Sequence, residues 1–134
     1  MYSRAKEIVK NMVGQKVTRI SIEQYSVRLL IDQTEITVEG HWKLMDSVGN
    51  VVDHNHDGEQ RSAFLLWKVL GSDIAASRVE SLPNLAIEFN NGWRFEAESE
   101  NGGYEAWQLS SSELGLAICN GTIITEFNLP KLTK

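Results

Sequence analysis

A short polar segment from Asp53 to Gly58 holds two histidines and two aspartates, which are residue types that bind metal ions or move protons. In a strand, His54 and His56 would share one face, and together with Asp53 they could bind zinc. In a loop ahead of a helix, the same side chains lack a fixed geometry and the second shell of hydrogen bonds that orients ligands. We expect an exposed polar linker whose Asp57 or Gly58 helps to start the following helix, with the zinc site as the alternative.

His41 and Cys119 also have side chains suited to catalysis. His41 sits beside Trp42, and no Ser, Cys or carboxylate at a meaningful spacing completes a catalytic arrangement with it, so a partly buried structural histidine is favoured over an acid or base. Cys119 ends the apolar run from Leu116 and has no nearby histidine or cation that would lower its pKa. We expect a small buried hydrophobe. As the only cysteine, it has no partner for an intrachain disulfide, which fits a reducing cytoplasm.

Glu96 and Glu98 are two residues apart in a predicted strand, so they lie on one face with Arg94 beside them. Two neighbouring carboxylates can serve acid and base catalysis. A solvated strand face partly compensated by Arg94 is the simpler interpretation.

The same region suits recognition of another molecule better than chemistry. Several acids and an aromatic side chain would lie along one edge of the domain, next to the Gly-rich segment Asn101-Gly102-Gly103. Tyrosine is a favoured anchor in interfaces, and ordered acids can mimic a phosphate chain towards a basic protein. The predicted partner-binding residues are Glu88, Glu96, Glu98, Glu100, Tyr104 and Glu105.

The charge of the chain is unevenly distributed. The net charge is −5, and the segment from Glu80 to Glu113 holds seven acids against one base, Arg94, which leaves the rest of the chain at +1. An acidic half repels phosphate backbones and attracts a basic protein surface. Direct binding to nucleic acid is therefore disfavoured, and an ordinary solvated surface is the alternative explanation.

Length and composition indicate a soluble globular domain. The chain has 134 residues, 42% of them hydrophobic and 23% charged, which is enough for one domain with its own core. The apolar stretches are too short to cross a bilayer, and the N-terminus lacks the pattern of a signal peptide. No phosphate-binding Gly-rich loop, zinc-spaced cysteine pair or Gly-x-Ser-x-Gly elbow is present, so we expect neither an enzyme nor a cofactor.

Two stretches have the three-and-four spacing of a helix with one apolar face. Ser3 can cap the first, whose apolar face consists of Ala5, Ile8, Val9, Met12 and Val13. The second lies within Arg61 to Leu70, and its apolar face consists of Ala63, Phe64, Trp67 and Leu70. Gly14 and Gly71 follow these stretches and can supply the left-handed residue that ends a helix. We expect two helices.

Alternating apolar and polar residues after each helix predict strands. In the first half these strands are Val17 to Glu23, Val27 to Ile31 and one that begins at Ile36. In the second half they flank two turns, Asn90-Asn91-Gly92 and Asn120-Gly121. An Asn-Gly pair is the strongest short-range hairpin signal, because both residues tolerate positive φ.

The order of these features predicts an internal duplication. The pattern of Val13 to Val17 recurs in Leu70 to Ile74, 57 positions later, and each half then reaches a Trp-polar-Leu triplet, at Trp42 or Trp107. Chance similarity between two amphipathic segments is the alternative. We predict a single domain over residues 1–134, with pseudo-repeats at about 3–53 and 61–127.

The expected fold class follows from these elements. It is α+β, with two helices packed on twisted, mainly antiparallel β-sheets and built from two repeated helix-then-β-meander units. The apolar faces should enclose all four tryptophans, Trp42, Trp67, Trp93 and Trp107.

Four features resemble a family of small bacterial proteins of unassigned function. They are the segment from Tyr104 to Leu109, the Gly-x-x-Val openings, a Trp-x-Leu triplet followed by Asp46 and Gly49, and an acidic strand before the tyrosine. The likeness spans about Val13 to Phe127, although the family's usual Pro-Gly-Gly turn is replaced here by Asn120-Gly121. Such proteins are found among the immunity proteins of polymorphic toxin and contact-dependent growth inhibition systems. The resemblance implies a cytoplasmic inhibitor bound to a toxin domain, often a nuclease.

The sequence thus leads to the hypothesis of a toxin-neutralising immunity protein that acts in the cytoplasm without catalysis. The expected partner is a cognate, basic protein toxin, with no direct contact to nucleic acid or membrane. A non-enzymatic binding or scaffold module with another partner is the alternative, and under it the acids only keep the protein soluble.

Overall fold

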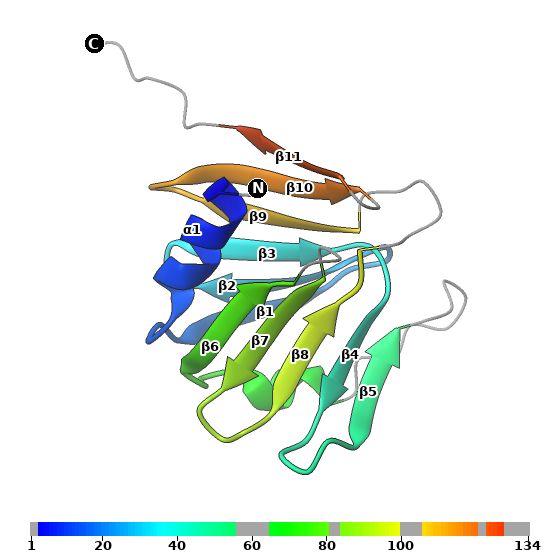
Figure 1. Cartoon of the computed structure of the whole chain (residues 1–134). Coiled ribbons are helices and arrows are strands. Elements are labelled where there is room, and N and C mark those ends of the chain that lie inside the picture. Colours follow the sequence, from blue (N-terminus) through cyan, green and yellow to red (C-terminus); the bar gives the residue numbers. More distant parts are fainter. Residues whose placement is uncertain (1–2, 56–64, 81–83, 100–105, 121–122, 128–134) are drawn as a thin grey trace.

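The computed structural model of this chain describes residues 3–55, 65–80, 84–99, 106–120 and 123–127. These residues form one α-helix, one short 3-10 helix and eleven strands in two sheets (Figure 1). The larger sheet has the strand order β1 (Val17–Ile22), β2 (Val27–Ile31), β3 (Thr34–Val38), β9 (Trp107–Ser111), β10 (Gly115–Asn120), β11 (Ile123–Phe127). The smaller sheet has the order β5 (Val51–Asn55), β4 (Trp42–Met45), β8 (Arg94–Ala97), β7 (Leu85–Phe89), β6 (Ile74–Val79). Every neighbouring pair in both sheets is antiparallel.

The inner faces of both sheets share one hydrophobic core. Alternate residues of each strand point inward, as Leu85, Ile87 and Phe89 do on β7. Trp42 and Phe95 stack within this core with ring centroids 5.6 Å apart, and both are buried. The two sheets are therefore held together by continuous apolar packing.

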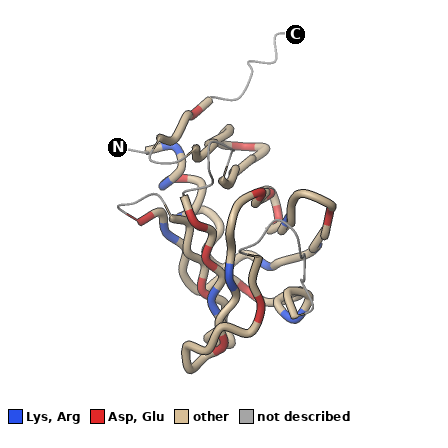
Figure 2. Tube along the Cα trace, turned by 90° about the vertical axis from the view of Figure 1, so that its right-hand side faces the viewer, with Lys and Arg blue, Asp and Glu red and all other residues tan. Residues whose placement is uncertain are grey.

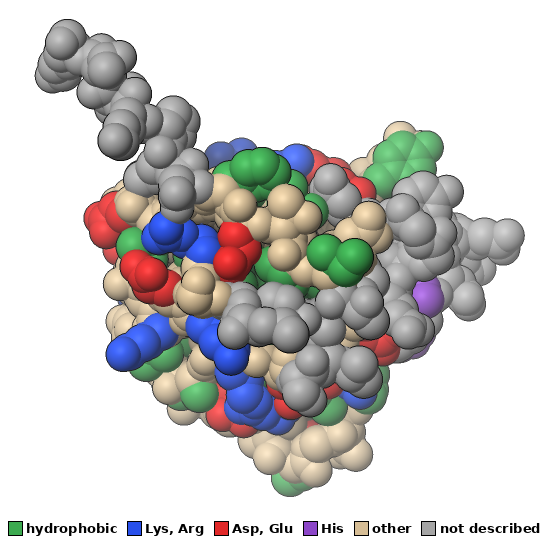
Figure 3. Space-filling model, turned by 45° about the horizontal axis from the view of Figure 1, so that its top comes forward, with side chains coloured by type: hydrophobic (Ala, Val, Ile, Leu, Met, Phe, Trp, Pro, Cys, Tyr) green, Lys and Arg blue, Asp and Glu red, His purple; other side chains and the backbone are tan. Residues whose placement is uncertain are grey.

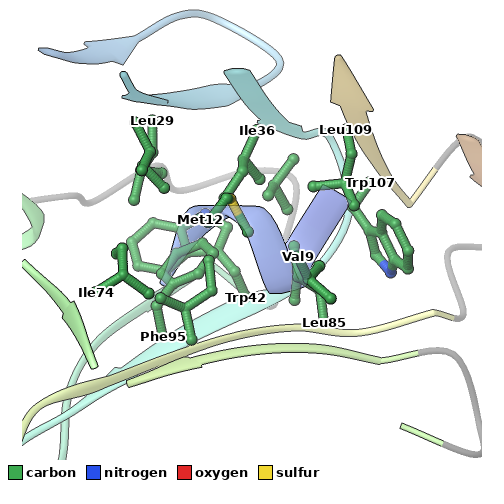
Figure 4. Close-up of a cluster of buried hydrophobic side chains, with 14 of the residues drawn as sticks. Val9, Met12, Leu29, Ile36, Trp42, Ile74, Leu85, Phe95, Trp107 and Leu109 are labelled. Atoms are coloured by element: carbon green, nitrogen blue, oxygen red, sulfur yellow. The ribbon is translucent and has the colours of Figure 1, made fainter. Parts of the chain in front are cut away.

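Helix α1 (Ser3–Met12) fills the space between the sheets at one side. Its buried face consists of Ala5, Ile8, Val9 and Met12. In Figure 4, Val9 and Met12 lie between Leu29, Ile36 and Leu109 of the larger sheet and Ile74, Leu85 and Phe95 of the smaller one. The helix is also tied to the last strand, because the Ala5 N–H donates a 2.6 Å hydrogen bond to Glu126 Oε2 on β11.

The chain passes between the sheets twice, and the two passages lie side by side. Strand β3 leads into β4, and β8 leads towards β9, while β3 pairs with β9 and β4 pairs with β8. Ala106 C=O accepts hydrogen bonds from Glu39 and Gly40, at 3.1 and 3.0 Å, and Glu98 N–H donates to His41 C=O at 2.9 Å. Each half of the sequence therefore contributes strands to both sheets.

Two glycine turns join the outermost strand of one sheet to that of the other. Gly14 N–H donates to Ile74 C=O, and Gly71 N–H donates to Val17 C=O, both at 2.8 Å. The two glycines have φ of +85° and +84°, a region that other residues rarely adopt. The strands that follow, β1 and β6, each have a register irregularity directly after their first residue. The turns are thus arranged with local two-fold symmetry, and the duplication at 3–53 and 61–127 stays a prediction.

The α+β prediction, with two helices and repeated helix-then-meander units, is wrong. The described residues form a mainly β structure with a single α-helix, and the second predicted helix is a 3-10 helix, η1 (Leu66–Val69). Residues 61–64 lie outside the described part. Leu66 and Val69, three residues apart, are buried, and Trp67 and Leu70 are exposed. The continuous apolar run of this segment satisfies more than one helical phase, so its pattern could not show which side is buried.

Several strands were also missed, and two tryptophans lie elsewhere than predicted. The Trp-polar-Leu triplets are parts of β4 and β9, and the segment read as a linker after Val52 continues as β5 to Asn55. Trp42 and Trp107 are buried as predicted, Trp93 is partly buried against the core, and Trp67 is 59% exposed. The hairpins around Asn90 to Gly92 and around Asn120-Gly121 are confirmed.

The contrast between the tryptophans can be tested by substitution. We expect Trp107→Ala to lower the free energy of unfolding by about 3–5 kcal/mol, because it removes a buried indole and leaves a cavity. Trp67→Ala should change it by about 0.5 kcal/mol or less. Urea unfolding followed by far-UV circular dichroism measures both, and equal losses would contradict this packing.

The glycine turns give a second test. A Cβ at Gly71 would meet no atom within 4 Å, so the effect of a substitution comes from the backbone conformation alone. We expect Gly71→Ala to lower the free energy of unfolding by about 1–2 kcal/mol and Gly71→Asn to lower it less, because asparagine tolerates the left-handed region. If Gly71→Ala and Gly71→Asn are equally stable, the positive φ of Gly71 is not the source of the destabilisation.

Candidate protein-binding surface

The outer face of the smaller sheet carries the residues that the sequence singled out. Strand β8 lies in the middle of this sheet, with Phe95 and Ala97 buried and Arg94 and Glu96 directed outward. No helix of the described chain lies in front of this face in Figure 1. As far as the described residues show, the face is therefore uncovered.

Neighbouring strands place charged residues next to those of β8. Glu88 on β7 is opposite Arg94, and Lys43 on β4 is opposite Glu96. Arg78 is on β6, and Glu80 is the first residue after that strand. His41 directly precedes β4, and Glu98 directly follows β8. We refer to the following set as the charged face: His41, Lys43, Arg78, Glu80, Glu88, Arg94, Glu96 and Glu98.

Arg94 is the centre of the charged face. Its guanidinium forms ion pairs with three carboxylates, those of Glu80 and Glu88 at 3.7 Å each and that of Glu96 through Nε. The side chain of Arg94 is 25% exposed and that of Glu96 18% exposed, so the central pair is partly shielded from water. The planar, five-donor geometry of arginine allows one side chain to hold several carboxylates.

Other ion pairs extend the network to both sides. Lys43 Nζ lies 3.6 Å from Glu96, and Arg78 Nε lies 3.7 Å from Glu80. His41 Nδ1 is 3.5 Å from Glu98 Oε2, a contact that becomes an ion pair when the imidazole is protonated. Figure 2 shows acidic and basic positions close together along these strands.

The charged face is nearly neutral as a whole. Its four glutamates are matched by three cations, Lys43, Arg78 and Arg94, which leaves one negative charge when His41 is neutral. Ion pairs at a surface add little to the stability of a fold, but a connected network restricts the rotamers of its members. The arrangement therefore provides ordered charges of both signs.

Asp53 lies on the opposite side of its sheet from the charged face. Its carboxylate is buried and accepts hydrogen bonds from the N–H groups of Leu65 and Leu66, at 2.9 and 3.0 Å, and from that of His54 at 3.0 Å. It thus starts the turn of η1, as an N-cap residue does for a helix. His54 is exposed, and it pairs with Lys43, so its side chain points outward.

A comparison with protein families identifies one match. The model of a family of unknown function, DUF6188, matches residues 8–122. The chain belongs to the DUF6188 family. The resemblance to a family of unassigned function is thereby confirmed at this level. Searches of curated proteins and of solved structures give no significant match.

The fold of this DUF6188 chain brings together three of the six predicted partner-binding residues. Glu88, Glu96 and Glu98 share the charged face, and the prediction that Arg94 compensates the neighbouring acids is confirmed. The other three, Glu100, Tyr104 and Glu105, lie outside the described residues. Sequence reasoning missed Lys43 and Arg78. The alternation around Trp42 does predict that Lys43 points away from the core, but nothing in the sequence showed that β4 lies beside β8.

The zinc arrangement suggested by the polar segment is not supported by the described residues. Asp53 and His54 point to opposite faces of β5, while His56 and Asp57 lie outside the described part. Within the described ranges, no group of three or more His, Cys, Asp or Glu side chains could hold a metal ion.

Cys119 is fully buried, as predicted, and burial raises the pKa of its thiol to about 11. The thiol is therefore protonated near neutral pH, the form that is a poor nucleophile. Among the described residues, no helix has the length and apolar character required to span a membrane.

The role of Asp53 can be tested by stability measurements. We expect Asp53→Ala to lower the free energy of unfolding by about 1–3 kcal/mol, because the buried amides of η1 lose their acceptor. Asp73→Ala is the matched control, since that carboxylate is exposed and pairs only with Lys16, at 2.9 Å, on the surface; its effect should stay below about 1 kcal/mol. Chemical denaturation measures the free energy of unfolding of both variants. If Asp73→Ala loses more stability than Asp53→Ala, Asp53 does not have this capping role.

Proposed function

We propose that this protein is a non-enzymatic binding protein that neutralises a cognate toxin domain, and that the toxin binds to the charged face. Two observations support this proposal. The sequence resembles proteins found among the immunity proteins of toxin systems, and the smaller sheet offers an uncovered surface of ordered charges.

The observation that carries the proposal is the ion-pair network around Arg94. A protein that must bind tightly loses less entropy when its contact residues are already held in one arrangement. Glu80, Glu88 and Glu96 all lie within ion-pair distance of one guanidinium, which favours such an arrangement. Arginine is also enriched in protein interfaces, where charge complementarity determines which partner is accepted.

The exposure of the acids indicates which of them the toxin would contact. The side chains of Glu88 and Glu98 are 42% and 36% exposed, whereas that of Glu96 is 18% exposed and lies against Arg94 and Lys43. In the proposed complex, basic residues of the toxin reach Glu88 and Glu98, and Glu96 keeps the central arginine in place. Because the face is close to neutral, the toxin surface should carry acidic groups as well as basic ones, which refines the simple picture of a basic partner.

The proposed site of action is the cytoplasm. A toxin that enters or is made in a cell would have to be neutralised there, and a chain whose single cysteine, Cys119, is buried is compatible with a reducing compartment.

The proposal is tested with the double variant Glu88→Lys with Glu98→Lys. The reversed charges would face basic toxin residues, and like charges placed together cost several kcal/mol, so we expect the dissociation constant for the toxin encoded by the adjacent upstream gene to rise about 100-fold or more. Isothermal titration calorimetry measures the affinity, and survival of cells that express the toxin measures protection.

The matched control is Glu7→Lys with Glu113→Lys, which changes the net charge by the same amount. Both residues are exposed, one on α1 and the other in the turn between β9 and β10. This control should bind and protect as the native protein does. If the two double variants bind equally well, the charged face is not the binding site. If the native protein neither binds the neighbouring gene product nor protects cells, the toxin-neutralising function itself is wrong, and a scaffold module with another partner is favoured.

A further inference from the structure

A second candidate surface for binding is the outer edge of the larger sheet, where β11 has no neighbouring strand among the described residues. Strand β11 is paired with β10 on one side, and on the other side every second residue directs its N–H and C=O groups away from the sheet. Natural edge strands are protected from pairing by prolines, bulges, short length or charged side chains, including charges that point inward. Strand β11 has no proline, its pairing with β10 is regular, and its outward residues are Ile123, Thr125 and Phe127.

The only charge in β11 points the other way. Glu126 alternates with the outward residues and accepts the N–H of Ala5 in α1. Its carboxylate therefore lies on the inner side of the strand, where it is engaged by this N–H, and the outer side of the strand carries no charge.

Apolar side chains lie along the outer face of the sheet next to this edge. Ile123 and Phe127 are 66% and 48% exposed, and Leu116 and Ile118 on the neighbouring strand β10 face the same side and are only partly buried. Figure 3 views the molecule with the β9 to β11 side turned forward, and hydrophobic side chains reach the surface there. An exposed apolar edge strand of this kind is typical of a site for strand pairing.

We propose that a second copy of this chain binds at β11, so that two larger sheets join edge to edge about a two-fold axis through Thr125. In this antiparallel arrangement Ile123 faces Phe127 of the other copy, and the reverse pair forms on the other side of the axis. Ile124 faces Glu126, and Thr125 faces its own equivalent. A β-branched residue opposite an aromatic one is a favourable cross-strand pair, and this register forms it twice.

The sequence of β11 favours this axis over its neighbours. An axis through Glu126 would place two carboxylates directly opposite each other, which is unfavourable. An axis through Ile124 would leave Phe127 without a β-branched partner. Only the axis through Thr125 pairs all five described residues of the strand, Ile123–Phe127, with one another.

The contact is small. One five-residue strand on each side lies at the low end of the sizes of specific interfaces, so the dimer should dissociate on dilution. We expect the mass measured by light scattering after size exclusion to rise from 15.1 kDa towards twice that value as the concentration increases from about 1 μM to about 1 mM.

The decisive variant is Thr125→Lys. Thr125 is exposed in the single chain, so the fold should tolerate lysine, but the two-fold axis would place two lysines opposite each other. This variant should remain at 15.1 kDa over the whole concentration range, with the melting temperature and circular dichroism of the native protein measured at low concentration. Ser110→Lys is the control, because Ser110 is exposed on the same outer face but on β9, away from the edge; it should still form the dimer.

A charge exchange tests the register. Thr125→Glu should also be monomeric, and an equimolar mixture of Thr125→Lys and Thr125→Glu should form a heterodimer, because only a two-fold axis at this residue brings the opposite charges together. A native protein that stays monomeric at about 1 mM, or a Thr125→Lys variant that dimerises normally, overturns the proposal. The proposal is also overturned if the native protein is monomeric and Thr125→Lys lowers its affinity for the toxin. In that case the edge of β11 would bind a strand of the toxin. The charged face and this edge are tested by different variants, so either proposal can fail alone.

Discussion

The structure depends on the reciprocal hydrogen bonds between the two glycine turns. Gly14 donates to Ile74 and Gly71 to Val17, while Val17 N–H donates to Ser72 C=O at 2.9 Å and Ile74 N–H to Gln15 C=O at 2.8 Å. These bonds connect the first residues of β1 and β6, which are the outermost strands of different sheets. They fix one corner of the molecule, and α1 and η1 pack beside that corner against β6 and β1. A left-handed glycine suits each turn because the chain must leave a helical segment and enter a strand with only four residues between them.

The same topology assembles the charged face from distant parts of the sequence. Because each half of the chain gives strands to both sheets, Lys43 from the first half comes to lie between the acids of the second. On the charged face, the four acids of the second half are therefore nearly matched by three cations, one of which comes from the first half. A surface of this kind attracts partners less by long-range charge than by the fit of individual positive and negative groups, so its contribution is mainly to specificity.

The sequence contained enough information for the local elements and too little for their assembly. The hairpins at Asn90 to Gly92 and Asn120-Gly121, and the common face of Arg94 and Glu96, follow from period and turn chemistry, and they are present. The predicted inward face of α1 is present too, except that Val13 lies beyond the helix and is 47% exposed. Strand β4 is four residues long, too short for a clear alternation, and the apolar run around Leu66 fits several helical phases. The orientation of the segment around Leu66 is fixed by Asp53 on β5, 13 positions away, whose carboxylate accepts the N–H of Leu66. Pairings between distant strands, such as β4 with β8, depend on the overall packing and cannot be read from a single sequence.

The hydrogen bond between Ala5 and Glu126 links α1 to β11 across 121 positions of the sequence. A ribosome makes α1 before β11, so the first turn of the helix receives this acceptor only after the intervening strands have been made. The strands β9 and β10, against which the same helix packs, also emerge late. Helix α1 is therefore made well before several of the strands on which it packs, and it can dock fully only once those strands have been synthesised.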